Sequence, residues 1–226
     1  MKIGVLLSGN GVYDGSEIQE SVFSLLAIAE NGGDVLFMAP NVKQMHVVNH
    51  LSGEEMPEER NVLVESARIA RGDIEDLANI SVKDFDALVI PGGFGTAKNH
   101  TNWAVKGPDS EINAEVKELV LECVKNKKPI AALCMGPTTV AKALQGTEFH
   151  AKLTIGSNSE NSPYNIKAIS DGVNATGSIH QACTVKEICW DEKLKIVSAP
   201  CYMMEASILE VRNNIKEAIK RLFSVI

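Results

Sequence analysis

The sequence predicts an α/β domain with a mostly parallel central sheet and helices on both faces. Short, continuous apolar runs alternate with longer segments of helical periodicity, and most of the apolar runs are followed by proline or glycine. Continuous apolar runs are typical of strands that are buried on both faces. A repeated strand-then-helix order implies a parallel sheet. No internal repeat or linker divides the chain, so we expect one domain over residues 1–226.

The expected elements follow in order along the chain. The strands are Ile3–Leu7, Asp34–Ala39, Asp86–Ile90, Ile130–Leu133 and Lys195–Ala199. Three helices are indicated by apolar residues at helical spacing: Ile18, Val22, Leu25, Leu26 and Ala29; Ile112, Val116, Leu119, Val120 and Cys123; and Ile208, Val211, Ile215, Ile219 and Leu222. Ligands of such sheets bind beyond the carboxyl ends of the strands, so the loops there form one candidate site.

Two segments are less regular. Residues 41–82 contain weaker helical patterns, in which His46 and His50 could share a helix face. The residues between these histidines lack the glutamate of a zinc hydrolase, so we expect no metal site. Residues 156–183 are rich in Ser, Asn and Gly, which is typical either of a flap beside the site or of a plain surface excursion.

Composition narrows the class of protein. The hydrophobic fraction of 45% and the charged fraction of 23% are those of an ordinary globular protein. A net charge of -7 argues against nucleic acid or an anionic membrane as the main partner. We find no signal peptide and no membrane-spanning run. The five cysteines lack paired spacing, which indicates a reducing compartment, and we expect the cytoplasm.

The most informative stretch is Pro129-Ile-Ala-Ala-Leu-Cys-Met-Gly-Pro-Thr-Thr139. An apolar strand leads into Cys134, Gly136 permits a sharp turn, and Pro137 suits the first turn of a helix. This order is that of a nucleophile elbow with sulfur in place of serine oxygen. The helix N-terminus would stabilise a thiolate on Cys134, although a small buried core thiol fits the same residue type.

Two further features lie at the same sheet edge. Glu17 opens the helix after the first strand, where it is either an acid or base for Cys134 or simply part of a capping box with Asp14. Pro91-Gly-Gly-Phe-Gly95 follows the third strand and leaves backbone N–H groups unobstructed. We expect the N–H groups of Gly93 and Met135 to form an oxyanion hole, with a simple tight turn as the alternative.

Several blocks of the sequence resemble a known family. They are Ser8-Gly-Asn-Gly-Val-Tyr-Asp-Gly-Ser-Glu17, Gln44-Met-His-Val-Val-Asn-His50, Asn61-Val-Leu-Val-Glu-Ser-Ala-Arg-Ile-Ala-Arg71 and Pro91-Gly-Gly-Phe-Gly-Thr-Ala-Lys-Asn99. In order and spacing they are similar to the ElbB glyoxalase group of the ThiJ/PfpI, class I glutamine amidotransferase-like superfamily. The similarity covers nearly the whole chain and weakens between residues 150 and 190.

The resemblance implies a flavodoxin-like three-layer sandwich, often dimeric, with Cys134 as nucleophile and Glu17 as its carboxyl partner. It also implies conversion of glyoxal to glycolate, or action on glycated groups, without a cofactor, and an older link to isoprenoid biosynthesis. Asn10, Asn99, Cys201 and His180 are candidate accessory residues of this site.

The chain departs from the wider superfamily at two places. Protease-like members have a histidine directly after the nucleophile, where this chain has Met135, and glutaminase members have a histidine after the last strand, where this chain has only Glu205. Amide hydrolysis needs a base that later protonates the leaving nitrogen, and none is evident. Aldehyde chemistry is less demanding, so the sequence predicts a glyoxalase-type enzyme acting on a small dicarbonyl through a hemithioacetal on Cys134.

Other functions stay open from the sequence. Cys201 could form a redox pair with Cys134, which would make the protein a thiol-based sensor, and a scaffold that kept the fold without catalysis is a third reading. The glycines at residues 9, 11 and 15 superficially resemble a dinucleotide fingerprint. Their spacing is one residue too long, and the second strand ends without the acidic residue that binds ribose, which argues against a nucleotide site.

Overall fold

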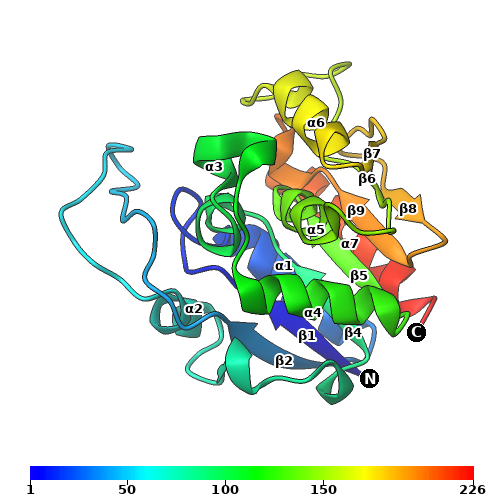
Figure 1. Ribbon diagram of the computed structural model, residues 1–226, viewed down its shortest axis with the longest axis horizontal. Coiled ribbons are helices and arrows are strands. Elements are labelled where there is room, and N and C mark those ends of the chain that lie inside the picture. The colour runs from blue at the N-terminus through cyan, green and yellow to red at the C-terminus, as the bar shows by residue number, and fades with distance from the viewer.

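A seven-stranded sheet forms the middle layer of the protein (Figure 1). The computed structural model describes residues 1–226. The strands of this sheet are β1 (Lys2–Leu6), β2 (Asp34–Ala39), β3 (Glu75–Asp76), β4 (Ala87–Ile90), β5 (Ile130–Leu133), β8 (Cys189–Asp191) and β9 (Ile196–Ala199). Their order is β3-β2-β1-β4-β5-β9-β8, and only β8 runs antiparallel to its neighbour. The predicted mostly parallel sheet is confirmed.

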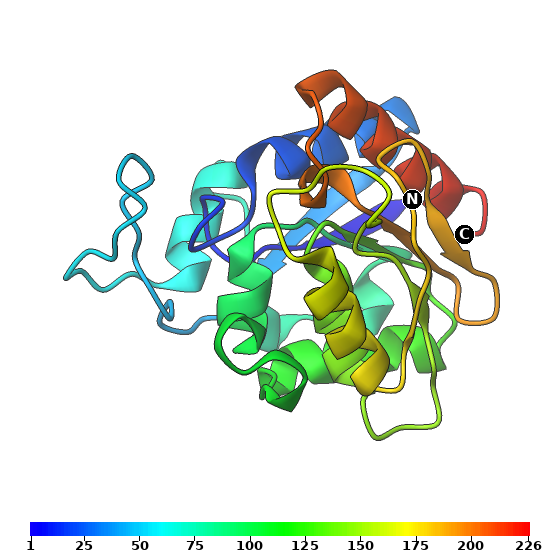
Figure 2. The same ribbon diagram turned by 90° about the horizontal axis from the view of Figure 1, so that it is seen from above.

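Helices cover both faces of this sheet and complete a three-layer sandwich (Figures 1 and 2). On one face lie α1 (Ile18–Glu30) and α7 (Ile208–Phe223), and on the other lie α4 (Ala114–Lys125) and α5 (Gly136–Leu144). The remaining elements include α2 (Val62–Ile69), α3 (Trp103–Lys106), α6 (Ile166–Ala175) and a small parallel sheet of β6 (Lys152–Leu153) and β7 (Ile179–His180). No helix is long and apolar enough to cross a membrane.

The central strands are buried because helices cover both their faces. All residues of β4, β5 and β9 are buried, as their continuous apolar sequences predict. They belong to one hydrophobic cluster that also includes the inner faces of α4, α5 and α7. The parallel register brings the loops after β1, β4, β5 and β9 to one edge of the sheet.

Helix α1 lies at the predicted place in the chain, but the face that it turns toward the core is not the apolar stripe. The apolar stripe expected to face the core is largely exposed, with Ile18, Val22 and Leu26 retaining 47%, 49% and 47% of their accessible surface. The buried residues of α1 are instead Glu20, Ser21, Ser24, Ala27 and Ile28. The hydrophobic pattern therefore located this helix correctly and gave the wrong buried face.

Two irregular segments also differ from expectation. Residues 41–61 form a non-helical arm that projects from the body of the molecule in both views, so His46 and His50 do not share a helix face (Figures 1 and 2). The arm is fixed at its base where Asp14 Oδ2 accepts from Val48 N at 2.7 Å. Residues 156–183 contain α6 and β7 and are thus partly regular.

Candidate active site

Cys134 occupies a strained turn between β5 and α5. Its φ is 54°, in the left-handed region that non-glycine residues seldom adopt, and its N–H donates to Ala199 O at 2.9 Å. The sequence assigned this turn to Gly136, but Cys134 itself takes the unusual conformation. Gly136 is required for a different reason, since a Cβ there would lie 2.8 Å from Ile90 O. Pro137 lies in the first turn of α5, as predicted.

Glu20 is the carboxyl group that lies beside the Cys134 thiol, since a Cβ built at Gly92 would lie 2.4 Å from Glu20 Oε2 and 2.8 Å from Cys134 Sγ. It lies in the first turn of α1 and is completely buried. Its Oε2 accepts from Gly92 N at 3.1 Å, and its Oε1 accepts from Tyr202 N at 3.1 Å. One carboxyl group therefore connects the loops that follow β4, β5 and β9.

Burial controls the protonation of this pair. Desolvation, reinforced by the nearby charge of Glu17, raises the pKa of Glu20 from an ordinary 4.5 to about 8, so Glu20 is a neutral acid at pH 7. Burial and the adjacent Glu20 also raise the pKa of Cys134 well above its ordinary value of 9.0. The sequence predicted a thiolate stabilised by the helix N-terminus. That prediction is wrong for the resting protein, because desolvation outweighs the helix end.

Glu17 lies one turn earlier in the chain and has a different environment. Its carboxylate caps α1 by accepting from Glu20 N at 2.6 Å, so the predicted place beside Cys134 is taken by Glu20 instead. Burial raises the pKa of Glu17, opposed by hydrogen bonds from the N–H groups of Glu20, Gln19 and Ile18. Glu17 nevertheless lines the same cavity as Cys134, where it is only half-buried.

The glycine-rich loop after β4 places main-chain atoms close to the sulfur of Cys134. The N–H groups of Gly93 and Met135 both donate to the Cys134 sulfur, so the structure brings together the two groups predicted as an oxyanion hole. A Cβ at Gly92 would lie 2.3 Å from the Cys134 Cβ and 2.4 Å from Glu20 Oε2. Gly92 is therefore a steric requirement of the Cys134–Glu20 contact.

A small cavity lies beside the Cys134 side chain. Its lining is Val12, Glu17, Gly93, Phe94, Cys134, Met135, Tyr164, Tyr202 and Met203. Only Glu17 carries a formal charge among these residues, and the lining includes no lysine, arginine or histidine. The cavity suits a small, uncharged, partly apolar molecule.

Two of the predicted accessory residues lie outside this cavity. The side-chain amide of Asn99 is occupied by structural hydrogen bonds. Its Nδ2 donates to Ser8 O and Asp14 O, and its Oδ1 accepts from Met45 N. It ties the loop after β1 to the base of the arm. Asn10 pairs with Ser16 in an isolated bridge of the same loop and does not line the cavity.

The other two accessory candidates also do not line the cavity. Cys201 is fully buried in a left-handed turn with φ of 50°, and its thiol hydrogen-bonds to the Cys134 backbone. Burial raises its pKa well above 9.0. His180 lies on β7, where burial lowers its pKa and Nε2 has no hydrogen-bond partner.

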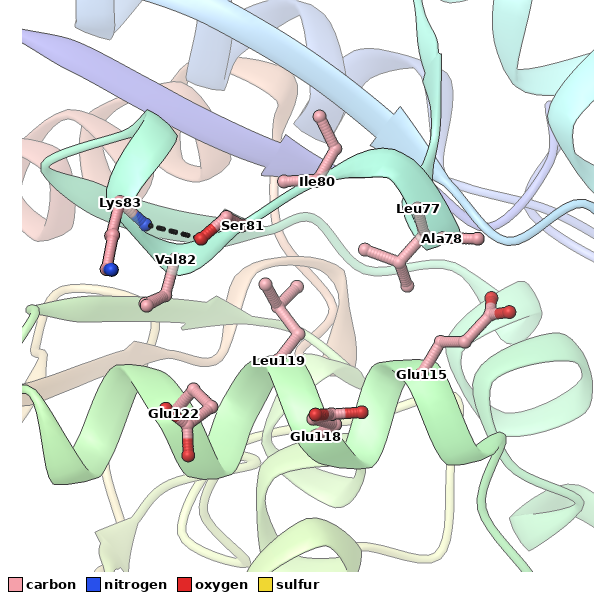
Figure 3. A pocket seen from close by; sticks show the side chains of 10 residues that line it. All are labelled: Leu77, Ala78, Ile80, Ser81, Val82, Lys83, Glu115, Glu118, Leu119 and Glu122. Atoms are coloured by element: carbon pink, nitrogen blue, oxygen red, sulfur yellow. Dashed lines mark hydrogen bonds between the residues drawn. The ribbon is translucent and has the colours of Figure 1, made fainter.

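A second, larger groove lies between α4 and residues 77–83 (Figure 3). Leu77, Val82 and Leu119 contribute its apolar surface, while Glu115, Glu118 and Glu122 project from α4 along one side. Its lining contains no cysteine or histidine, so it offers no nucleophile of the kind found at the small cavity.

Comparison with known proteins places the chain in a family. Residues 12–155 match the DJ-1/PfpI family, and the chain belongs to it. The human mitochondrial glutamine amidotransferase-like class 1 domain-containing protein 3 is 39% identical over 99% of this chain and 83% of its own length. The predicted superfamily is confirmed.

Solved structures agree on the fold. An isoprenoid biosynthesis protein with an amidotransferase-like domain from Ehrlichia chaffeensis superimposes with a TM-score of 0.90 at 36% identity, over 100% of this chain and 99% of that one. Glyoxalase III from Candida albicans superimposes with a TM-score of 0.61 at 11% identity, over 98% and 97% of the two chains. The second likeness concerns the fold alone.

Sequence reasoning missed Glu20, the carboxyl group next to Cys134. It follows Glu17 by one helical turn, and the apolar stripe directed attention to the opposite face of the helix. A signal was present: Glu20, Ser24 and Ala27 lie on one face, and a glutamate among small residues is a poor surface pattern. Tyr164 and Phe94, which close the cavity, had no recognisable pattern because they come from irregular loops.

Proposed function

We propose that this protein is a cofactor-independent, glyoxalase III-type enzyme that converts glyoxal or a related small dicarbonyl to a hydroxy acid. The observation that carries the proposal is the buried Glu20 carboxyl, with its raised pKa, placed next to the Cys134 thiol, which lines a small cavity. The resemblance of the sequence to the ElbB glyoxalase group supports it further, and a deglycase-like action on glycated groups uses the same first step.

In the proposed first step, Glu17 accepts the thiol proton while the Cys134 sulfur bonds to one aldehyde carbon. Glu20 donates a hydrogen bond to the sulfur and limits the charge that develops there. The resulting alkoxide meets the N–H groups of Gly93 and Met135 and takes up the proton, giving a neutral hemithioacetal.

In the proposed second step, Glu17 removes the proton from the sulfur-bearing carbon and returns it to the neighbouring carbon through an enediol. The first carbon is oxidised to a thioester and the second is reduced to an alcohol, so no external oxidant is needed. One water then hydrolyses the thioester, releasing glycolate and restoring the thiol. Two carboxyl groups in unlike environments thus divide the roles of acid and base.

The charge around the cavity supports an uncharged substrate. Glu17 faces the cavity, Glu20 lies behind it, and no cation lines it. An anionic carbonyl compound would be repelled and desolvated without compensation. We expect glyoxal to be processed and the carboxylate glyoxylate to be rejected.

The decisive experiment measures glycolate formation from glyoxal by chromatography. The Cys134→Ser variant should lose all turnover, whereas the matched control Cys183→Ser, which changes a buried thiol outside the cavity, should keep it. Glu17→Gln should lower kcat by about 10²-fold or more, because it removes the base. Retained activity in Cys134→Ser would rule out the mechanism.

A thiol-based sensor is the second candidate function, and the contact between the Cys201 thiol and the Cys134 backbone is the observation that favours it. A peroxide would oxidise Cys134 to a sulfenic acid with release of water, and Cys201 would displace a second water to form the disulfide. The burial and raised pKa of Cys201 oppose this route. Peptide mapping after peroxide treatment distinguishes the two functions, because the sensor requires a Cys134–Cys201 bond.

An inert Cys134 and no turnover would favour a non-catalytic amidotransferase-like protein, with a role such as the isoprenoid biosynthesis named for the Ehrlichia protein.

We also propose a homodimer and a reducing compartment. The exposed stripe of Ile18, Val22 and Leu26 on α1 supports self-association through this helix. Sedimentation should give a dimer. The Val22→Glu variant should dissociate this dimer, whereas Val64→Glu, at an exposed site on α2, should leave it intact.

All five cysteines are free, which supports the cytoplasm, although the human and rat relatives are named as mitochondrial proteins.

A further inference from the structure

Tyr164 lies at the mouth of the cavity above Cys134, on the loop that precedes α6. Its ring meets Phe94 edge to face, with centroids 5.6 Å apart and an interplanar angle of 76°. Both rings line the cavity, so they define how a small molecule approaches the sulfur. Neither the nucleophile nor either carboxyl group in the proposed mechanism depends on Tyr164.

The loop that carries Tyr164 is tied to the turn after β9. Tyr164 N donates to Ser162 Oγ at 3.0 Å, and Ser162 Oγ donates in turn to Met203 O at 2.6 Å. Glu205 N also donates to Asn161 O at 2.9 Å. The same turn holds Glu20 through Tyr202 N, so Tyr164 and the Cys134–Glu20 pair are positioned by one rigid segment.

The hydroxyl of Tyr164 is unused by the protein. The hydrogen bonds of this residue come from its backbone N–H and carbonyl, whereas the Tyr202 hydroxyl donates to Gln19 Oε1. Burial and the nearby acidic groups of Cys134 and Glu20 raise the pKa of Tyr164 to about 12. The phenol therefore stays protonated at neutral pH and is available as a hydrogen-bond donor.

A dicarbonyl substrate brings two oxygens into this cavity, and the backbone donors account for only one of them. The N–H groups of Gly93 and Met135 point at the sulfur and so serve the oxygen on the attacked carbon. A second oxygen on the neighbouring carbon would need another donor, and the cavity lining includes no lysine, arginine or histidine. Leaving that oxygen unpaired in a desolvated site would be costly.

We propose that the Tyr164 hydroxyl donates a hydrogen bond to the second oxygen of the substrate, the one on the carbon next to the carbon that Cys134 attacks. This inference rests on the proposed function and adds a substrate-binding residue to it. It assigns the enzyme to substrates with adjacent oxygen-bearing carbons. It also gives residues 156–183 a role, because this segment supplies a group that contacts substrate.

The test uses a probe that carries only the second oxygen. Iodoacetamide alkylates a thiol at a carbon whose neighbour bears a carbonyl oxygen, whereas iodomethane lacks that oxygen. In both reactions an S–C bond forms, the C–I bond breaks, and the thiol proton is released. Alkylation rates at Cys134 are measured by peptide mass spectrometry in the wild type, Tyr164→Phe and Tyr13→Phe. The last variant makes the same change on a ring outside the cavity.

Tyr164→Phe should lower the ratio of the iodoacetamide rate to the iodomethane rate about tenfold, the effect of one hydrogen bond, and Tyr13→Phe should leave it within twofold. The kcat/KM for glyoxal should fall by a similar factor. An unchanged ratio overturns the role of Tyr164, including the case in which a loosened cavity speeds both reagents equally. A wild type that does not turn over glyoxal refutes the proposed function instead, and the rate ratio still decides whether Tyr164 binds the oxygen.

Discussion

Helices α1 and α7 lie side by side on the same face of the sheet but bury opposite kinds of surface (Figure 2). Helix α7 turns its apolar stripe inward and buries Val211, Ile215, Ala218, Ile219 and Leu222. Helix α1 turns a glutamate, two serines and two apolar residues inward and leaves Ile18, Val22 and Leu26 about half-exposed. The orientation of α7 follows from hydrophobic burial, whereas that of α1 brings Glu20 to the nucleophile.

The polar face of α1 is compatible with burial because its groups are satisfied. Ser21 Oγ donates to Glu17 O and Ser24 Oγ donates to Glu20 O, both at 2.7 Å, and both Glu20 oxygens accept backbone N–H groups. Keeping Glu20 protonated avoids the much larger cost of an isolated buried charge. The buried polar face of α1 is therefore held by hydrogen bonds, whereas the inner face of α7 is held mainly by apolar packing.

The largest effect is expected in the core under α7. Ile215→Ala removes a fully buried side chain and should lower the free energy of unfolding by about 2–5 kcal/mol. Urea denaturation followed by circular dichroism measures this change. A loss below about 1 kcal/mol would mean that α7 is not a main source of stability.

The second prediction concerns the pH dependence that Glu20 imposes. The folded-state pKa of about 8 lies above the ordinary 4.5, so the folded state retains a proton that the unfolded state loses. The contribution of Glu20 is fully present below pH 4.5 and falls by ~1.4 kcal/mol per pH unit until about pH 8. Denaturation at several pH values should reveal this decline in the wild type and a weaker one in Glu20→Gln. Parallel curves for the two proteins would contradict the assignment.

The two helix caps should also separate structure from function. Ser207 caps α7 in a capping box with Glu210, so Ser207→Ala should cost about 1 kcal/mol without changing glyoxal turnover. Glu17→Gln keeps an oxygen acceptor at the cap of α1 and should cost less stability, while the rate falls. Thermal melts and turnover measured on the same samples test both statements, and equal rates would reduce Glu17 to a cap.

The smallest effect is expected on the outer face of α1. Val22→Ala shortens a side chain that is 49% exposed and should change monomer stability by no more than about 0.5 kcal/mol. Denaturation at low protein concentration isolates this value from any contribution of self-association. A loss comparable to that of Ile215→Ala would show that this face of α1 is covered in the folded protein.

Much of the fold and part of the site could be predicted from the sequence. The strands β2 and β5 have the predicted bounds, β4 and β9 begin one residue later than predicted, and β1 is shifted by one residue at both ends. Cys134 and Gly93, which line one cavity in the structure, could be placed at the same sheet edge because strand, turn and helix signals are local. The arm at residues 41–61 and the antiparallel strand β8 were missed, since neither has a regular hydrophobic pattern.

The sequence by itself determined the alternating strands and helices, their parallel pairing and the position of Cys134 at the end of β5. These features depend on periodicity and turn chemistry, which are written into neighbouring residues. Only the tertiary structure decided that Glu20 rather than Glu17 contacts the sulfur, that the thiol is protonated at rest, and that Tyr164 closes the cavity. Rotation of a helix about its axis and desolvation of a carboxyl group depend on residues far apart in the chain, so no local pattern contains them.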